Sequence, residues 1–109
     1  MILKVRLVKK TWRIEAKETI YIPTWKIISL TATPHYLYIT YDELDTHEEV
    51  GSYHKNVAIH LNFNDKLDEE KALEITEAFA EEIIAMIKDR SVRIVDVDEI
   101  KKKYEVVMK

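Results

Sequence analysis

The chain has 109 residues, of which 47% are hydrophobic and 34% charged, and its formal net charge at pH 7 is −3. This length fits one domain that can bury a core without covalent cross-links. The sequence has no cysteine and a single glycine, Gly51. It therefore excludes disulfides, thiolate chemistry and sulfur-bound zinc, as well as the glycine-rich loops that hold nucleotides, and we predict no cofactor.

Location follows from the same composition. No apolar run approaches the roughly 18 residues of a membrane span, and the first residues alternate charged with aliphatic side chains, unlike a signal peptide. We expect a cytoplasmic protein that does not enter the membrane. The absence of glutamine and the scarcity of glycine are typical of thermophilic proteins, which says nothing about activity.

The N-terminal residues predict a β-hairpin with a turn near Lys10. Residues 2–8 alternate in the manner of a half-buried strand, and residues 12–17 continue the alternation. Leu3, Val5, Leu7, Trp12, Ile14 and Ala16 should face the core, with Lys4, Arg6, Arg13, Glu15 and Lys17 on the other face.

Charge is distributed unevenly along the chain. Residues 1–26 carry seven Lys or Arg against two Glu, whereas residues 42–82 carry three against thirteen Asp or Glu. A locally basic sheet face can attract nucleic acid even when the whole chain is slightly acidic. The nucleic-acid candidates are Lys4, Arg6, Arg13 and Lys17.

Residues 27–41 are uncharged, which is unusual in so charged a chain, and they predict two strands joined near Thr33 and Pro34. Such a segment is either a strand pair covered on both faces or an interface. We expect a homodimer, with Ile28, Leu30, Tyr36 and Tyr38 as interface candidates.

Residues 42–54 form an acidic stretch that indicates a loop. Its carboxylates and His47 could serve a metal-assisted nuclease or hydrolase, but no recognised ligand spacing is present, and we predict neither metal ligands nor catalytic residues. A solvated loop explains the composition equally well.

A strand over residues 57–63 precedes the strongest element of the chain, an amphipathic helix over 68–89. Asp68 is its expected N-cap, and its buried stripe runs through Ala72, Phe79 and Ile83. After the helix we predict a strand at 92–97, a turn near 98–103 and a last strand around 106–107. The fold class is α+β: a mostly antiparallel sheet of about five or six strands with this helix across one face.

Residues 57–83, VAIHLNFNDKLDEEKALEITEAFAEEI, resemble the strand and helix that precede the metal-binding histidines of relaxases from mobilisable plasmids. In those enzymes a His-x-His pair follows on the next strand, whereas VRIVDV here contains no histidine. The resemblance covers about a quarter of the chain and implies no relaxase activity.

The leading hypothesis is a non-catalytic interaction module that forms a homodimer and acts on another macromolecule inside the cell, such as a protein partner. The alternatives are a nucleic-acid-binding protein that uses the basic sheet face and an enzyme that uses the acidic loop.

Overall fold

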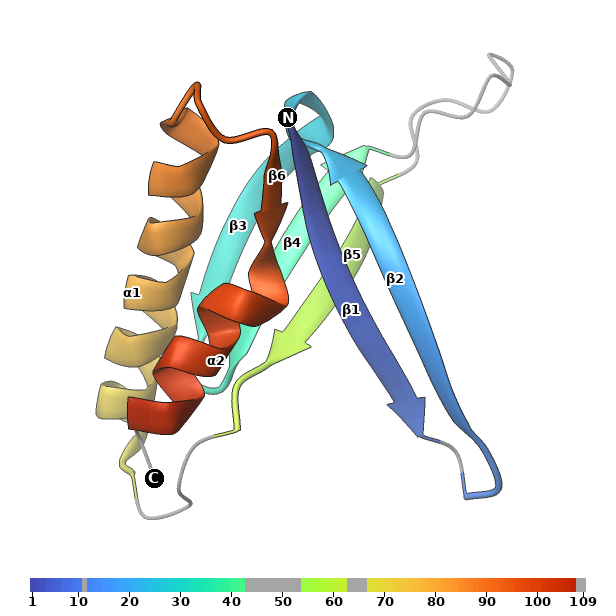
Figure 1. Cartoon of the computed structure of the whole chain (residues 1–109). Helices are drawn as coiled ribbons and strands as arrows, with labels where there is room; N and C mark the ends of the chain where they lie inside the picture. Colours follow the sequence, from blue (N-terminus) through green and yellow to red (C-terminus); the bar gives the residue numbers. More distant parts are fainter. Residues whose placement is uncertain (11, 43–53, 63–66, 108–109) are drawn as a thin grey trace.

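The computed structural model describes residues 1–10, 12–42, 54–62 and 67–107. In chain order its elements are β1 (Ile2–Lys10), β2 (Glu15–Pro23), the 3-10 helix η1 (Thr24–Lys26), β3 (Ile27–Thr33), β4 (Tyr36–Asp42), β5 (His54–His60), α1 (Glu69–Lys88), β6 (Ile94–Asp96) and α2 (Val97–Val107) (Figure 1). The predicted α+β class is confirmed. Among the described helices, none combines the length and apolarity that crossing a membrane requires.

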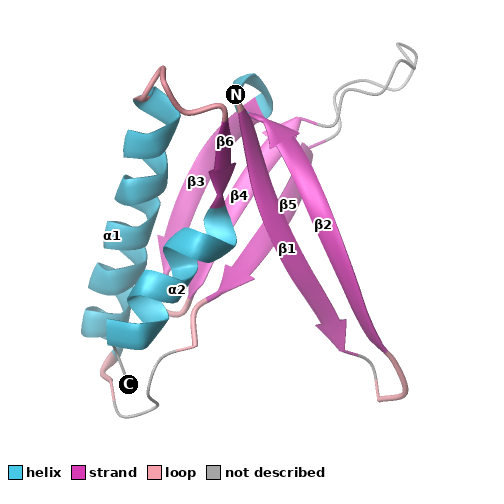
Figure 2. Ribbon diagram, viewed as in Figure 1, coloured by secondary structure: helices cyan, strands magenta, loops and turns pink. Residues whose placement is uncertain are grey.

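The six strands divide into two sheets of order β2-β1-β6 and β3-β4-β5, where the sequence indicated one (Figure 2). All neighbours are antiparallel except β1 and β6, which run parallel. The division follows from the chain between β2 and β3. Pro23 has no N–H for a ladder and ends β2, and η1 then redirects the chain into the second sheet.

Helix α1 forms as its sequence predicts. The Asp68 carboxylate accepts a hydrogen bond from the Lys71 backbone N–H at 2.8 Å, which caps the first turn. Ala72, Phe79 and Ile83 are fully buried in the core, whose sheet residues include Leu3 and Val5 of β1 and Leu37 and Ile39 of β4. The glutamates on the opposite side of α1 are exposed.

The C-terminal prediction was wrong in part. Only Ile94–Asp96 form a strand, and residues 97–107 form the helix α2 instead of a turn and a last strand. The Asp98 backbone N–H donates to the Asp96 carboxylate at 3.1 Å, which starts the helix. Val97 and Ile100 are buried, and the Tyr104 ring packs against Phe79 at a centroid distance of 5.7 Å.

The predicted hairpin is present, with Lys10 opposite Glu15, but its second strand begins later than predicted. Trp12 and Ile14 precede β2 and are 84% and 66% exposed, and Ala16 within β2 is exposed as well, so the expectation that these three face the core was wrong. The alternation predicted a strand there, but among the described elements none lies over this part of the hairpin (Figure 1).

Candidate interaction site

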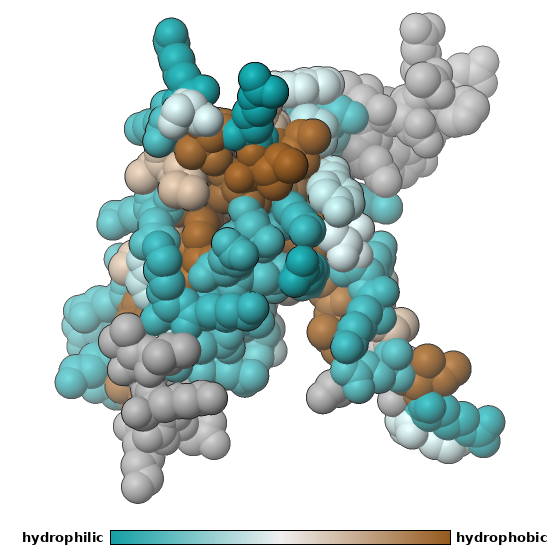
Figure 3. All heavy atoms as spheres, in the orientation of Figure 1, coloured by the Kyte–Doolittle hydropathy of each residue, from teal (hydrophilic) through white to brown (hydrophobic). Residues whose placement is uncertain are grey.

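The hairpin extends beyond the rest of the molecule. We call residues 6–10 and 12–19 the arm. In Figure 1 the arm diverges from β5 and from both helices. Residues 12–19 are all exposed, Val8 is 53% exposed, and Figure 3 shows hydrophobic atoms toward the far end of the arm. The arm is thus a two-stranded ribbon with little cover, an arrangement that is only marginally stable on its own.

A hollow of about 840 Å³ separates the arm from β5 and the beginning of α2, and an adjoining one of about 620 Å³ extends it along β5. We call the two together the trough. Both share five lining residues, Leu7, Val8, Glu18, Thr19 and Ala58. β5 is the edge strand of its sheet within the described residues, so the trough lies beside an unpaired strand edge.

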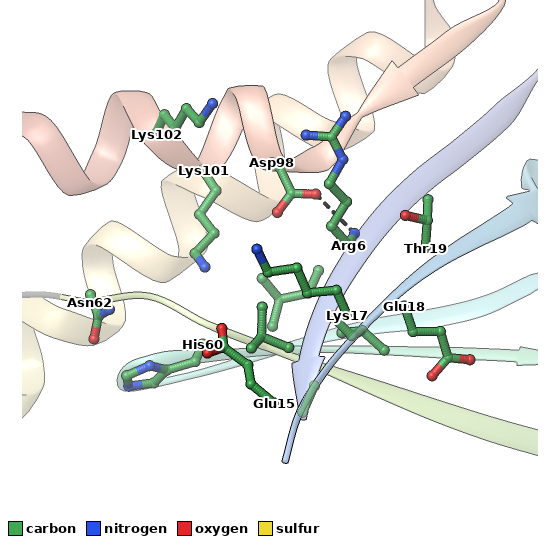
Figure 4. Close-up of a pocket in the computed structure, with 14 residues that line it drawn as sticks. Arg6, Glu15, Lys17, Glu18, Thr19, His60, Asn62, Asp98, Lys101 and Lys102 are labelled. Carbon is green, nitrogen blue, oxygen red and sulfur yellow. Dashed lines mark hydrogen bonds between the residues drawn. The ribbon is translucent and has the colours of Figure 1, made fainter. Parts of the chain in front are cut away.

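The trough is lined about equally by polar and apolar surface and carries charges of both signs. Its cations are Arg6, Lys17, Lys55, Lys101 and Lys102, and its carboxylates are Glu15, Glu18 and Asp98. In Figure 4, Lys17 and Lys101 extend toward the same hollow from opposite walls. The Asp98 carboxylate is engaged, since it accepts the Arg6 backbone N–H at 2.9 Å. This mixture of charges favours a partner of similarly mixed charge.

The nucleic-acid candidates are spread along the hairpin. Lys4, Arg6 and Lys17 lie on the face of β1 and β2 away from the core, as the alternation predicts, because their neighbours Leu3 and Val5 are buried. Lys4 lies 4.0 Å from the Asp96 carboxylate, which offsets part of its charge. Arg13 lies in the connection between the strands, with its guanidinium 3.9 Å from the centre of the Trp12 ring. No single concentrated basic patch results from these positions.

Three of the four interface candidates lie away from the core. Tyr36 and Tyr38 project from the outer face of β4 with their rings 5.9 Å apart and stacked, and Ile28 is 52% exposed beside a bulge in β3. Leu30 is opposite Ile39 and packs against the core, so it does not belong to this outer face.

The outer face of the second sheet has a distinct chemical character. Its three cross-strand rows are Thr33–Tyr36–His60, Thr31–Tyr38–Ala58 and Ser29–Thr40–Asn56. These side chains carry hydroxyl, aromatic and amide groups, and the Thr40 hydroxyl donates to the Asn56 side chain. The Thr33 hydroxyl donates to the Tyr36 carbonyl at 3.1 Å, and the Tyr36 ring packs against His60 at a centroid distance of 4.9 Å.

A third exposed cluster surrounds the N-terminus. Ile2 and Ile94 are neighbours across the parallel β1–β6 pair and are 38% and 57% exposed, and Tyr21 lies near them on β2. Figure 3 shows this hydrophobic area in the upper part of the molecule. It borders the Lys4–Asp96 pair.

Residues 43–53 of the predicted acidic loop lie outside the described residues. Within the described residues, no group of three or more His, Asp or Glu side chains is placed to share a metal ion. Comparisons with family models, curated proteins and solved structures gave no match, so the partial resemblance to relaxases has no support from them.

The trough and the arm were not apparent from the sequence. Alternation along residues 2–8 and 12–17 predicts a hairpin but not how far the hairpin extends past its neighbours. One signal was available. Glu18, opposite Leu7, occupies a position where a fully covered hairpin would have an apolar residue.

Proposed function

We propose that this protein is a non-catalytic interaction module that acts as a homodimer in the cytoplasm, a location that the cysteine-free sequence favours. The observation that carries the dimer is the exposure of large apolar side chains on the arm: Val8 is 53% exposed, Trp12 84% and Ile14 66%.

These apolar side chains supply a driving force for association, because a partner that covers them removes apolar surface from water. They lie on a two-stranded ribbon, which is only marginally stable without cover. A second copy of the chain is the simplest partner that covers the arm.

The mass in solution tests the proposal. Light scattering coupled to gel filtration, at protein concentrations from about 1 to 100 μM, should give twice the 12.9 kDa of the chain over most of this range, as expected for micromolar or tighter association. A mass of 12.9 kDa throughout would refute the homodimer.

A nucleic-acid-binding role is the second candidate, because Lys4, Arg6 and Lys17 share one sheet face. The homodimer is favoured over it because Asp96 offsets Lys4, and Glu15 lies beside Lys17 in the trough. The metal-assisted enzyme remains a sequence-based alternative that no observation favours.

A further inference from the structure

We propose that two copies of the chain associate by exchanging arms, so that the arm of each copy lies in the trough of the other. This inference rests on the proposed homodimer and names the surface through which it forms. The arm supplies strand β2 and its apolar residues, and the trough supplies the edge of β5 and the first turns of α2.

The arm and the trough are exposed for the same reason. The arm is one wall of its own trough and cannot fill it, so the chain alone leaves both without cover. The arm of a second copy covers both at once. If one copy inserts its arm and also receives one, the contact is isologous and closes as a two-fold dimer, whereas one-way insertion would build an open chain of molecules.

Backbone groups on one edge of β5 point into the trough. The Leu61 backbone N–H donates to the His35 carbonyl at 2.7 Å, so the residues that alternate with Leu61 direct their backbone groups away from β4. These residues are Asn56, Ala58 and His60, and all three line the trough. An extended strand can therefore pair with β5 from the trough side.

The arm offers such a strand. The Ile2 backbone N–H donates to the Arg93 carbonyl on the β6 side. The even-numbered residues of β1 therefore direct their backbone groups toward β6, and the odd-numbered residues direct theirs toward β2. On β2, Glu18 and Ile20 lie opposite Leu7 and Val5 and direct their backbone N–H and C=O groups toward β1. Lys17 and Thr19 alternate with them and therefore direct their backbone groups away from β1. Pairing of β2 from one copy with β5 of the other extends the β3-β4-β5 sheet by a strand.

Side-chain charge agrees with this pairing. Glu15 and Glu18 lie on β2, and the α2 wall of the trough carries Lys101 and Lys102. The acidic residue of that wall, Asp98, already accepts the Arg6 backbone N–H. Side chains alternate along a strand, so Glu15 and Glu18 lie on opposite faces of β2. An arriving arm can therefore direct the Glu15 carboxylate toward the two ammonium groups.

Matched substitutions test which surface forms the dimer. Val8 on the arm and Ile28 on the outer face of β3 are aliphatic and almost equally exposed, at 53% and 52%. Val8→Asp should raise the dimer dissociation constant by at least about 100-fold, because a two-fold interface contains the change twice, and Ile28→Asp should leave it within about threefold. Ile14 lies outside the strands, and Ile14→Asp should raise the dimer dissociation constant as Val8→Asp does. Circular dichroism shows whether each variant is folded.

Cross-linking tests the contact directly, since the natural chain has no cysteine. A Thr19→Cys chain is mixed with an isotopically heavy Ala58→Cys chain, and a short bis-maleimide is added. Mass spectrometry should detect a light–heavy pair. The pair should be absent when Ile84→Cys replaces Thr19→Cys, because α1, which carries Ile84, lies on the opposite side of the molecule from the arm (Figure 1).

The outcomes separate the two proposals. A dimer that survives Val8→Asp and Ile14→Asp but dissociates with Ile28→Asp or Ile94→Asp would overturn arm exchange and keep the homodimer. A wild-type chain that is monomeric at all concentrations would overturn both. Dissociation by the arm variants together with the light–heavy cross-link supports arm exchange.

Discussion

Replacing Phe79 by alanine probes the contact on which the core depends most. The side chain is completely buried, and its ring lies 5.7 Å from that of Tyr104 at an interplanar angle of 57°. Loss of burial costs about 1.5–3 kcal/mol. Loss of the tilted ring pair costs about 0.5–1.5 kcal/mol. With the cavity that remains, the free energy of unfolding should fall by about 3–5 kcal/mol.

Urea denaturation followed by circular dichroism measures this change. It should be repeated at several protein concentrations, because association stabilises the folded state by mass action. Ile84→Ala is the control, since Ile84 lies on the same helix but is 37% exposed, and it should cost less than about 1 kcal/mol. A loss below about 1 kcal/mol for Phe79→Ala would refute the assignment of α1 as the organising helix.

Three further predictions concern the helix cap, the alkaline limit and the basic face. Asp68→Ala should lower the free energy of unfolding by about 0.5–2 kcal/mol in urea melts, whereas Asp68→Asn should nearly preserve it. Burial, followed by the hydrogen bond and charge of Glu82, raises the pKa of Tyr104 above 10.0, so its contribution to stability is complete below pH 10 and is lost as pH rises through the higher folded-state pKa. Tyr104→Phe should flatten that alkaline decline in thermal melts, and an unchanged slope would contradict it. Labelled oligonucleotides should show no anisotropy change even at about 20 mM salt. Salt-sensitive binding whose slope falls by about two in a Lys4→Ala, Arg6→Ala variant would instead make this face a nucleic-acid site.

The sequence predicted elements where local patterns and tertiary packing agree. The period of α1, its Asp68 cap and the alternation in β1 all identify the residues that the core buries. α2 was also predictable in principle. Val97, Ile100 and Tyr104 recur at helical spacing after an Asp at the cap position, but the preceding β-branched run favoured a strand.

The arrangement of the sheets was beyond sequence patterns. Nothing in the alternation of residues 2–8 shows that β6 pairs with β1 from the far end of the chain. The candidate surfaces depend on the same arrangement, since the exposure of Val8 depends on which elements lie near it and not on the type of residue. Leu30 is one example: it packs against the core, but the absence of charge along residues 27–41 does not reveal which of these residues face inward.

The parallel pairing of β1 with β6 sets the order in which the chain can fold. β1 is the first of the described strands along the chain, but Ile2, Leu3 and Lys4 pair with β6 only when residues 94–96 are available. The β1–β2 hairpin and the β3-β4-β5 meander can form from near neighbours, whereas this closure spans about 90 residues and pays the entropy of a long loop. During synthesis the first hairpin therefore lacks this pairing until residues 94–96 have emerged. That interval exposes strand edges and apolar residues, and it is when the nascent protein is most open to misassembly.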